Sequence, residues 1–373
     1  MKIRNTASSG TAGGEAGLPR TSAWLRAQLD AGRFIGAQVH VGQAHKTIAD
    51  LAVGMARSGV PMTPATLNYW FCCTKPVIAI AAAQIVESQI INLDDRVCDI
   101  IPSFGAGGKE SITIRHLLSH TAGLRRFTRP RPFLASDSEI LSAVCRSEIQ
   151  EGWHPGRRAA YTPFASWYVL GELVQLLSGE RLPDYVRRHI FEPLGIDNCW
   201  LGMPSGIASK ERVNLAIPHA VTPGRAPVPI TLLASGATLQ LVNAASGAIG
   251  PISGLGRIFE AILHPERGSV LSPATVQMFV SPSRRRLFDE TYGFRWDWGL
   301  GFAVELGRLC SAVRGPGFGH PGGSALVLAD RAADRVVAVA LNGLTAWDGV
   351  PEVSTGSAVS QLARVIYSDL EAA

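Results

Sequence analysis

The segment Phe71-Cys72-Cys73-Thr74-Lys75-Pro76 stands at the start of a predicted long helix and carries the sharpest chemical signal in the chain. Residues three apart on a helix share one face, so Cys72 and Lys75 can touch. A lysine held against a thiol can accept its proton if burial lowers the pKa of the amine. The positive end of the helix dipole favours a thiolate at the same place. Two buried cysteines beside a surface lysine would give the same letters, so the hexapeptide alone leaves both interpretations open.

The composition indicates a large globular protein. Its 373 residues suit one large fold or two closely built domains, and 46% apolar against 17% charged residues excludes a disordered chain. The net charge of +5 is mild and the arginine clusters are short and scattered, which favours a solvated surface over a nucleic-acid interface. The longest uncharged apolar run, residues 76–86, is shorter than the ~18 residues of a membrane span. We therefore expect no nucleic acid and no membrane among the partners.

The amino-terminal residues and the cysteines bear on location. Residues 1–20 are rich in Gly, Ser, Ala and Thr, have no signal-peptide core, and are predicted to form a flexible tail. The six cysteines show neither tight disulfide spacing nor paired CxxC motifs for zinc. Without an export signal, reduced thiols and a cytoplasmic location are expected. No metal and no organic cofactor is implied, because His and carboxylate residues do not cluster in the sequence.

Strand and helix patterns predict the fold class. Strand patterns lie near both ends of the chain, at residues 34–41, 47–55, 322–329 and 335–342. Helical patterns lie at residues 21–31, 76–89, 115–124, 138–146, 165–177, 182–190 and 353–370. This order predicts an α/β (α+β) protein, with an antiparallel β-sheet flanked by helices and an inserted, mostly helical domain. The predicted sheet domain covers residues 21–95 plus 235–373, and the helical insert covers residues 96–234.

Four further segments follow the hexapeptide: LLSHTAGL at 117–124, PGRRAAY at 155–161, FEPLGI at 191–196 and GFGHPGGS at 317–324. In these motifs and in their order, the chain resembles the penicillin-binding-protein and class C β-lactamase-like family, which also holds esterases, D-amino-peptidases and acyltransferases. The resemblance extends from about residue 21 to residue 370. It implies a β-lactamase/transpeptidase-like fold and says little about the substrate.

The resemblance assigns roles to two of these motifs. The family's Ser-x-x-Lys motif begins the long helix, and Cys72 and Lys75 match it with cysteine in place of serine. Tyr161 matches the tyrosine of the Tyr-x-Asn motif, where Pro163 stands in place of asparagine and is expected to line the substrate site. The resemblance thus implies that Cys72 attacks the substrate while Lys75 and Tyr161 shuttle protons.

The third family motif, Lys-Thr-Gly or His-x-Gly, corresponds to His320-Pro321-Gly322. The resemblance places the backbone N–H groups of Cys72 and Gly323 in the oxyanion hole, and close approach of backbone to substrate suits the glycines. His320 is expected to orient a carbonyl or carboxylate, or to exchange protons near neutral pH. Gly322 and Trp298 are expected to contact the substrate. A structural histidine at a strand edge is the alternative for His320.

Other residues favour structural interpretations. Cys73 is adjacent to Cys72, but the spacing from 73 to 75 does not share a helical face, so Cys72 is the preferred nucleophile. In the family that the chain resembles, the segment that contains His120 packs at the junction of the domains, so the resemblance implies a structural role for His120. Gly317, Gly319 and Gly322 spell GxGxxG, but a strand follows them and no βαβ unit surrounds them, which argues against a dinucleotide site.

A thiol nucleophile would produce a thioester acyl-enzyme, which favours amine or thiol acceptors over water more than an oxygen ester does. We therefore expect a cytoplasmic acyltransferase of specialised metabolism, such as antibiotic biosynthesis. It would take an acyl group from a small-molecule or carrier-protein thioester donor and pass it to an amine or alcohol. An esterase, amidase or peptidase of the same fold is the nearer alternative, and a non-catalytic ligand-binding member is the more distant one. A true β-lactamase is disfavoured, because Cys72, Pro163 and His320 depart from its pattern.

Overall fold

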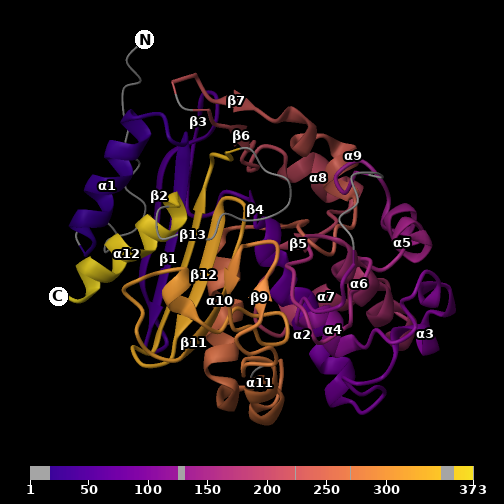
Figure 1. The fold of residues 1–373 in the computed structure, drawn as a ribbon. Helices are drawn as coiled ribbons and strands as arrows, with labels where there is room; N and C mark the ends of the chain where they lie inside the picture. Colours follow the sequence, from indigo (N-terminus) through magenta and orange to yellow (C-terminus); the bar gives the residue numbers. More distant parts are fainter. Residues whose placement is uncertain (1–16, 125–130, 223, 269, 346–356, 373) are drawn as a thin grey trace.

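The computed structural model describes residues 17–124, 131–222, 224–268, 270–345 and 357–372 (Figure 1). Its centre is a six-stranded sheet in the order β11-β12-β13-β1-β2-β3, with all neighbours antiparallel. The strands are β1 (Gly36–Gln43), β2 (Lys46–Arg57), β3 (Val60–Pro61), β11 (Gly317–Pro321), β12 (Ala325–Asp330) and β13 (Arg335–Leu341). The pairing of β1 with β13 joins the two ends of the chain, which confirms the predicted antiparallel sheet flanked by helices.

Helices cover both faces of this sheet. Residues of β12 and β13 are buried throughout, and their near-continuous apolar sequence is typical of strands covered on both faces. Helices α1 (Pro19–Asp30) and α12 (Ala358–Leu370) lie side by side against one face, as Figure 1 shows. Helix α10 (Ile252–Leu263) packs against β1, β12 and β13.

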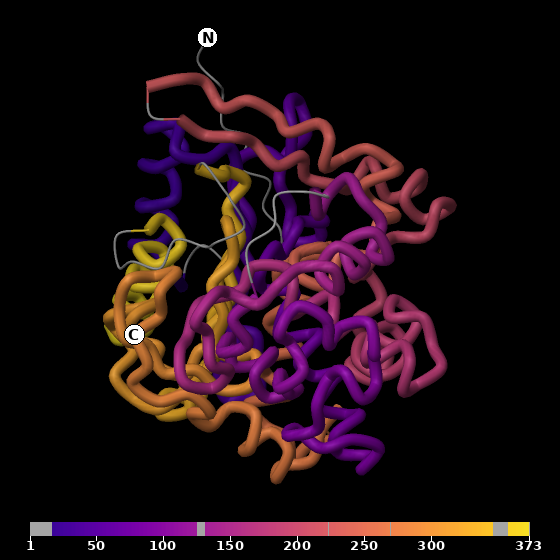
Figure 2. The backbone as a smooth tube through the Cα atoms, turned by 45° about the vertical axis from the view of Figure 1, so that its right-hand side comes forward, coloured from indigo at the N-terminus to yellow at the C-terminus, as the bar shows by residue number. Residues whose placement is uncertain are grey.

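The remaining helices form a second layer, and most of them share one apolar core with α2 (Lys75–Glu87), whose residues from Lys75 to Ala83 are all buried. They are α3 (Val97–Ile100), α4 (Ile114–Leu118), α5 (Asp137–Arg146), α6 (Ala165–Ser178), α7 (Leu182–Val186), α8 (Ser205–Glu211), α9 (Gly236–Gln240) and α11 (Pro273–Phe279). Short strands complete the fold: β4 (Asn68–Tyr69), β5 (Trp200–Leu201), β6 (His219–Ala220), β7 (Val228–Pro229), β8 (Ala248–Gly250), β9 (Phe288–Asp289) and β10 (Phe294–Arg295). Figure 2 shows the segment of β6 and β7 crossing one end of the sheet, where Leu344 N donates to His219 O over 2.7 Å.

Most predicted elements are confirmed to within a few residues, and the differences have physical causes. The helix predicted over 115–124 ends at Leu118, because His120 adopts a left-handed φ of 57°. The strand predicted over 322–329 begins at Ala325, because residues 322–324 form the turn between β11 and β12, in which Gly322 N donates to Ala325 O. Helix α12 begins at Ala358, and residues 353–356 of the predicted helix lie outside the described residues, as does most of the predicted tail.

The division into a sheet domain and a helical insert at residues 95 and 235 stays a prediction. None of the helices among the described residues has the length and apolar character needed to cross a membrane.

Candidate active site

The nucleophile candidate lies on a tight turn that feeds the buried helix. Residues Phe71–Thr74 form one 3₁₀ turn, and α2 starts directly after it at Lys75. Phe71 has a φ of 47°, an uncommon conformation for a bulky residue that persists only where surrounding structure enforces it. Cys72 is fully buried at the amino end of α2, where the helix dipole favours negative charge. The local backbone therefore presents the Cys72 thiol to the interior.

Lys75 lies against this thiol. Its side chain is fully buried, and Nζ donates to the Ala245 carbonyl oxygen over 3.0 Å. Burial lowers the pKa of Lys75 below its usual 10.5, and the charge and hydrogen bonding of Cys72 only partly oppose this effect. A buried amine with a lowered pKa can lose its proton and then accept one from a neighbouring thiol. Lys75 thus has the electrostatic character of a general base.

Tyr161 approaches the same group from another segment. The Lys75 Nζ lies 5.4 Å from the centre of the Tyr161 ring, and Tyr161 shares a buried apolar cluster with Cys72. Burial raises the pKa of Tyr161 well above 10, and the charge of Cys72 raises it further. The Tyr161 hydroxyl lacks a partner of regular hydrogen-bond geometry in the described part of the chain, although the Cys72 thiol is close enough to affect its pKa. The hydroxyl therefore keeps its proton and has the character of a general acid.

His320 faces this cluster from β11. Its Nδ1 lies 2.7 Å from the Pro321 carbonyl oxygen, and since a carbonyl only accepts, Nδ1 carries the proton. The Nε2 atom is then an acceptor, and it is buried without a partner among the residues that the structure describes. Burial, followed by the positive charge of Lys75, lowers the pKa of His320 well below 6.5. A neutral His320 can therefore accept a hydrogen bond from a substrate. The Trp298 ring packs against the His320 ring, with 5.5 Å between the ring centres.

The two adjacent cysteines differ in their surroundings. Cys73 Sγ donates to the His320 carbonyl oxygen over 3.2 Å, and burial raises the pKa of the Cys73 thiol well above 9. Cys73 thus joins the turn to β11 as a protonated thiol. Cys72 Sγ instead lies 3.9 Å from the Ser246 hydroxyl oxygen, on the side of Lys75 and Tyr161. This difference supports Cys72 as the nucleophile.

The remaining predicted site residues lie around this group. Gly322 N donates to Ala325 O over 2.7 Å, and a Cβ at Gly322 would stand 3.0 Å from the Trp70 carbonyl oxygen, so glycine permits this close approach. Gly323 follows it, and its N–H as an oxyanion donor stays a prediction, as does a substrate contact for Pro163, which is buried between Tyr161 and α6.

Sequence reasoning missed a loop that supports Lys75. The side chain of Asn243 accepts from the backbone N–H groups of Ala245 and Ser246 at 3.1 and 3.0 Å. These bonds orient the Ala245 carbonyl toward Lys75 and the Ser246 hydroxyl toward Cys72. No local pattern could have identified this loop, because it lies about 170 residues from the turn in the sequence.

A buried ion pair and a histidine hold the Tyr161 backbone. Asp289 Oδ1 accepts from Tyr161 N over 3.1 Å, and Asp289 Oδ2 accepts from Arg284 Nη2 over 2.7 Å. His120 Nδ1 accepts from Thr162 N over 3.0 Å, and its ring centre lies 4.5 Å from that of Tyr161. This contact agrees with the structural role predicted for His120, whereas Arg284 and Asp289 carried no motif.

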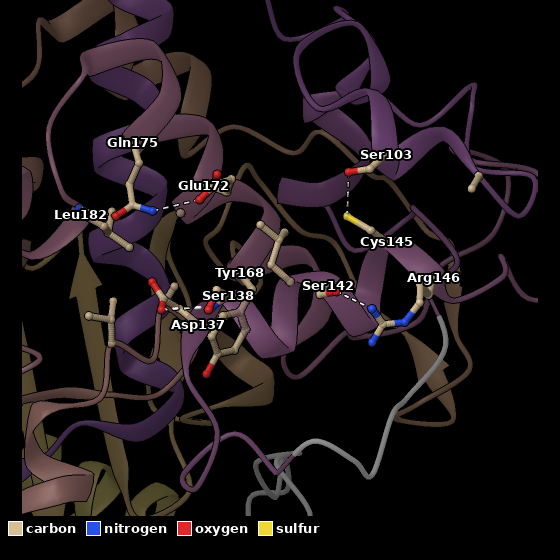
Figure 3. Close-up of a pocket in the computed structure, with 15 residues that line it drawn as sticks. Ser103, Asp137, Ser138, Ser142, Cys145, Arg146, Tyr168, Glu172, Gln175 and Leu182 are labelled. Atoms are coloured by element: carbon tan, nitrogen blue, oxygen red, sulfur yellow. Dashed lines mark hydrogen bonds between the residues drawn. The ribbon is translucent and has the colours of Figure 1, made fainter.

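A separate cavity of about 530 Å³ lies between α5 and α6 (Figure 3). Its polar lining includes Asp137, Ser138, Tyr168, Glu172 and Gln175. Cys72, Lys75, Tyr161 and His320 do not line it. The chemistry described above therefore belongs to the turn before α2 and not to this cavity.

Comparisons with known proteins establish the family. The family model described as Beta-lactamase matches residues 21–352, and the chain belongs to this family. It is 26% identical over 194 residues to the esterase/beta-lactamase LipL of Mycobacterium tuberculosis, covering 51% of this chain and 44% of LipL. It is 27% identical over 223 residues to the esterase EstB of Burkholderia gladioli, covering 53% of this chain and 55% of EstB. The matches thus span about half the length of these relatives.

A solved structure extends the likeness in fold to nearly the whole chain. EstCE1, a hydrolase with promiscuous acyltransferase activity, superposes with a TM-score of 0.79 at 23% identity. The superposition covers 95% of this chain and 99% of EstCE1. At this identity the likeness concerns the fold.

Proposed function

We propose that this protein is an enzyme that moves acyl groups through a covalent thioester on Cys72. The observation that carries the proposal is the placement of a thiol, a lysine with a lowered pKa and a tyrosine with a raised pKa in one buried group. Neighbouring titratable groups whose surroundings push their pKa values apart are the ordinary basis for assigning a general base and a general acid.

In the first half-reaction, neutral Lys75 takes the proton of Cys72 Sγ and the thiolate attacks the carbonyl carbon of the donor. The backbone N–H groups of Cys72 and Gly323 stabilise the tetrahedral oxyanion. The intermediate collapses, the C–S bond remains, and the leaving group departs with the proton of Tyr161. Transfer of the proton from the Lys75 ammonium to the Tyr161 phenolate then resets both groups.

In the second half-reaction, an acceptor amine or alcohol loses its proton to Lys75 as it attacks the thioester carbonyl. The Cys72 thiolate leaves and regains a proton from Lys75, so the overall proton count is unchanged. Because a thioester favours amines over water more than an oxygen ester does, the cysteine favours transfer over hydrolysis. His320 Nε2, a buried acceptor, suits a donor group on either substrate.

The proposed donor is a small activated ester or a carrier-protein thioester, and the proposed setting is specialised metabolism in the cytoplasm, such as antibiotic biosynthesis. Acyl transfer is the activity that the name of EstCE1 records beside hydrolysis. The names of LipL and EstB favour a second candidate, ester hydrolysis through the same Cys72 acyl-enzyme.

Intact-protein mass spectrometry after mixing with a panel of acyl thioesters and activated esters tests the proposal. We expect an acyl adduct on the wild-type protein and on Cys73→Ala, the matched control, but not on Cys72→Ala. An added amine should discharge the adduct faster than water does, and faster discharge by water would establish the hydrolase instead.

The binding-only alternative requires a further measurement. If no donor leaves an adduct and Cys72 is alkylated no faster than the other cysteines, the acyl-enzyme proposal is wrong.

A further inference from the structure

Three residues from distant parts of the sequence meet at one end of the sheet. His45 lies in the turn between β1 and β2, His264 follows the last residue of α10, and Asp334 lies in the turn between β12 and β13. One potential ligand atom from each lies within 4.8 Å of the other two. The rings of His45 and His264 are 3.9 Å apart between centres, and His264 Nε2 lies 2.8 Å from Asp334 Oδ1.

This cluster is distinct from the candidate active site. The sheet register pairs Gln43 with Arg335 at the end where the cluster lies. At the same end Asp330 pairs with Gly317, the first residue of β11, whereas His320 and Pro321 are the last two residues of that strand. The metal-ligand cluster and the candidate active site around His320 therefore lie toward opposite ends of the strands.

We propose that His45, His264 and Asp334 bind one divalent transition-metal ion of the zinc class. Two imidazoles and one carboxylate suit zinc, cobalt or nickel, whereas calcium and magnesium prefer oxygen ligands alone. Three protein ligands leave a coordination position for water.

The contacts of His264 indicate how the ion enters. The ion replaces the hydrogen-bonding proton between His264 Nε2 and Asp334 Oδ1. His264 then carries its proton on Nδ1, which lies 3.7 Å from Glu266 Oε1. A metal-bound histidine whose other nitrogen faces a carboxylate is a common arrangement that fixes the ring and its tautomer. Glu266 thus supports the site without ligating the ion.

The backbone holds two of the ligands in place. Ala44 N donates to Asp334 O over 3.0 Å, which ties the β1–β2 turn to the β12–β13 turn. Ligand atoms of a tetrahedral zinc site lie about 3.3 Å apart, from bond lengths near 2.0 Å. The exposed His45 ring can close the remaining gap by rotating about its side-chain bonds, whereas His264 and Asp334 are half-buried. Binding would clamp two hairpin turns and the end of α10 together.

Cobalt titration of the full-length, EDTA-treated protein tests the site, since cobalt(II) absorbs visible light and reports its coordination number. We expect one equivalent of cobalt(II) to give a visible absorption band. Zn²⁺ should displace the cobalt and raise the melting temperature of the protein. His45→Ala and His264→Ala should each weaken binding at least tenfold, while Glu266→Gln, a support residue, should weaken it by about tenfold.

His189→Ala is the matched control, because His189 Nε2 makes the same 2.8 Å contact with Glu180 Oε1 but belongs to no three-residue ligand cluster among the described residues. It should leave cobalt binding unchanged. Absence of a band up to about 1 mM cobalt, or a band that survives in the His45→Ala/His264→Ala double variant, would overturn the proposal. Circular dichroism of each variant separates lost binding from lost folding.

Discussion

Replacing Asp289 by alanine should destabilise the fold and impair the site together. The ion pair of Arg284 and Asp289 is buried, with exposed fractions of 2% and 0%. Removing one partner of such a pair leaves an uncompensated buried charge and typically costs about 3–5 kcal/mol. Asp289→Ala also removes the acceptor of Tyr161 N, and a misplacement near 1 Å can slow a reaction by about 100-fold.

The assay is urea unfolding of four proteins: wild type, Asp289→Ala, Arg284→Met and the double variant. Each single variant should lose about 3–5 kcal/mol, and the double variant should lose less than the sum, because neither charge is then stranded. Glu290→Gln is the matched control: the neighbouring pair of Arg158 and Glu290 is partly exposed, at 38% and 33%, and should contribute at most about 1 kcal/mol.

The rate of acyl-adduct formation should fall in Asp289→Ala and stay unchanged in Glu290→Gln. A loss of stability below about 1 kcal/mol in Asp289→Ala, or strictly additive losses in the double variant, would refute the reasoning.

Two further residues give separate predictions. Lys75→Met should slow acylation about 10²- to 10⁴-fold, and in the wild type the acylation rate should reach its plateau below pH 10.5, because burial lowers the pKa of Lys75. Between the folded pKa of Lys75 and 10.5 the Lys75 amine binds more protons in the unfolded chain than in the folded one, so the contribution of Lys75 to wild-type stability rises with pH across that window. Urea unfolding should therefore show that the free energy of unfolding of Lys75→Met exceeds that of the wild type most below this pH window and least near pH 10.5. A difference that does not depend on pH would contradict this. Gly301→Ala should cost about 1–3 kcal/mol or more, because its Cβ would lie 2.3 Å from Ala79 Cβ at a φ of 87°. Gly293→Ala, with a φ of 77° and open space around it, should cost only the backbone strain, and equal losses in the two variants would argue against the packing effect.

Local sequence determined the elements and the reactive turn. Apolar, β-branched runs at both ends of the chain predicted strands that the structure pairs as β1 with β13. The spacing from Cys72 to Lys75 predicted that the two side chains would meet, and the influence of Cys72 on the Lys75 pKa agrees with this. Such predictions succeed because strand alternation and helical spacing are properties of neighbouring residues. The order of the motifs predicted the family, which the match over residues 21–352 confirms.

Tertiary structure alone decided what surrounds that turn. Helix α4 ends just before His120, which has a left-handed backbone and accepts from Thr162 N. Helical periodicity in the sequence cannot predict this contact. Asp289 reaches Tyr161 across 128 residues, and Ser246 reaches Cys72 across 174. His45, His264 and Asp334 also come from separate parts of the chain and meet only where two hairpin turns and a helix end converge. Contacts of this kind depend on how sheet and helices pack, and the free energy of that packing is shared among residues that have no fixed spacing in the chain.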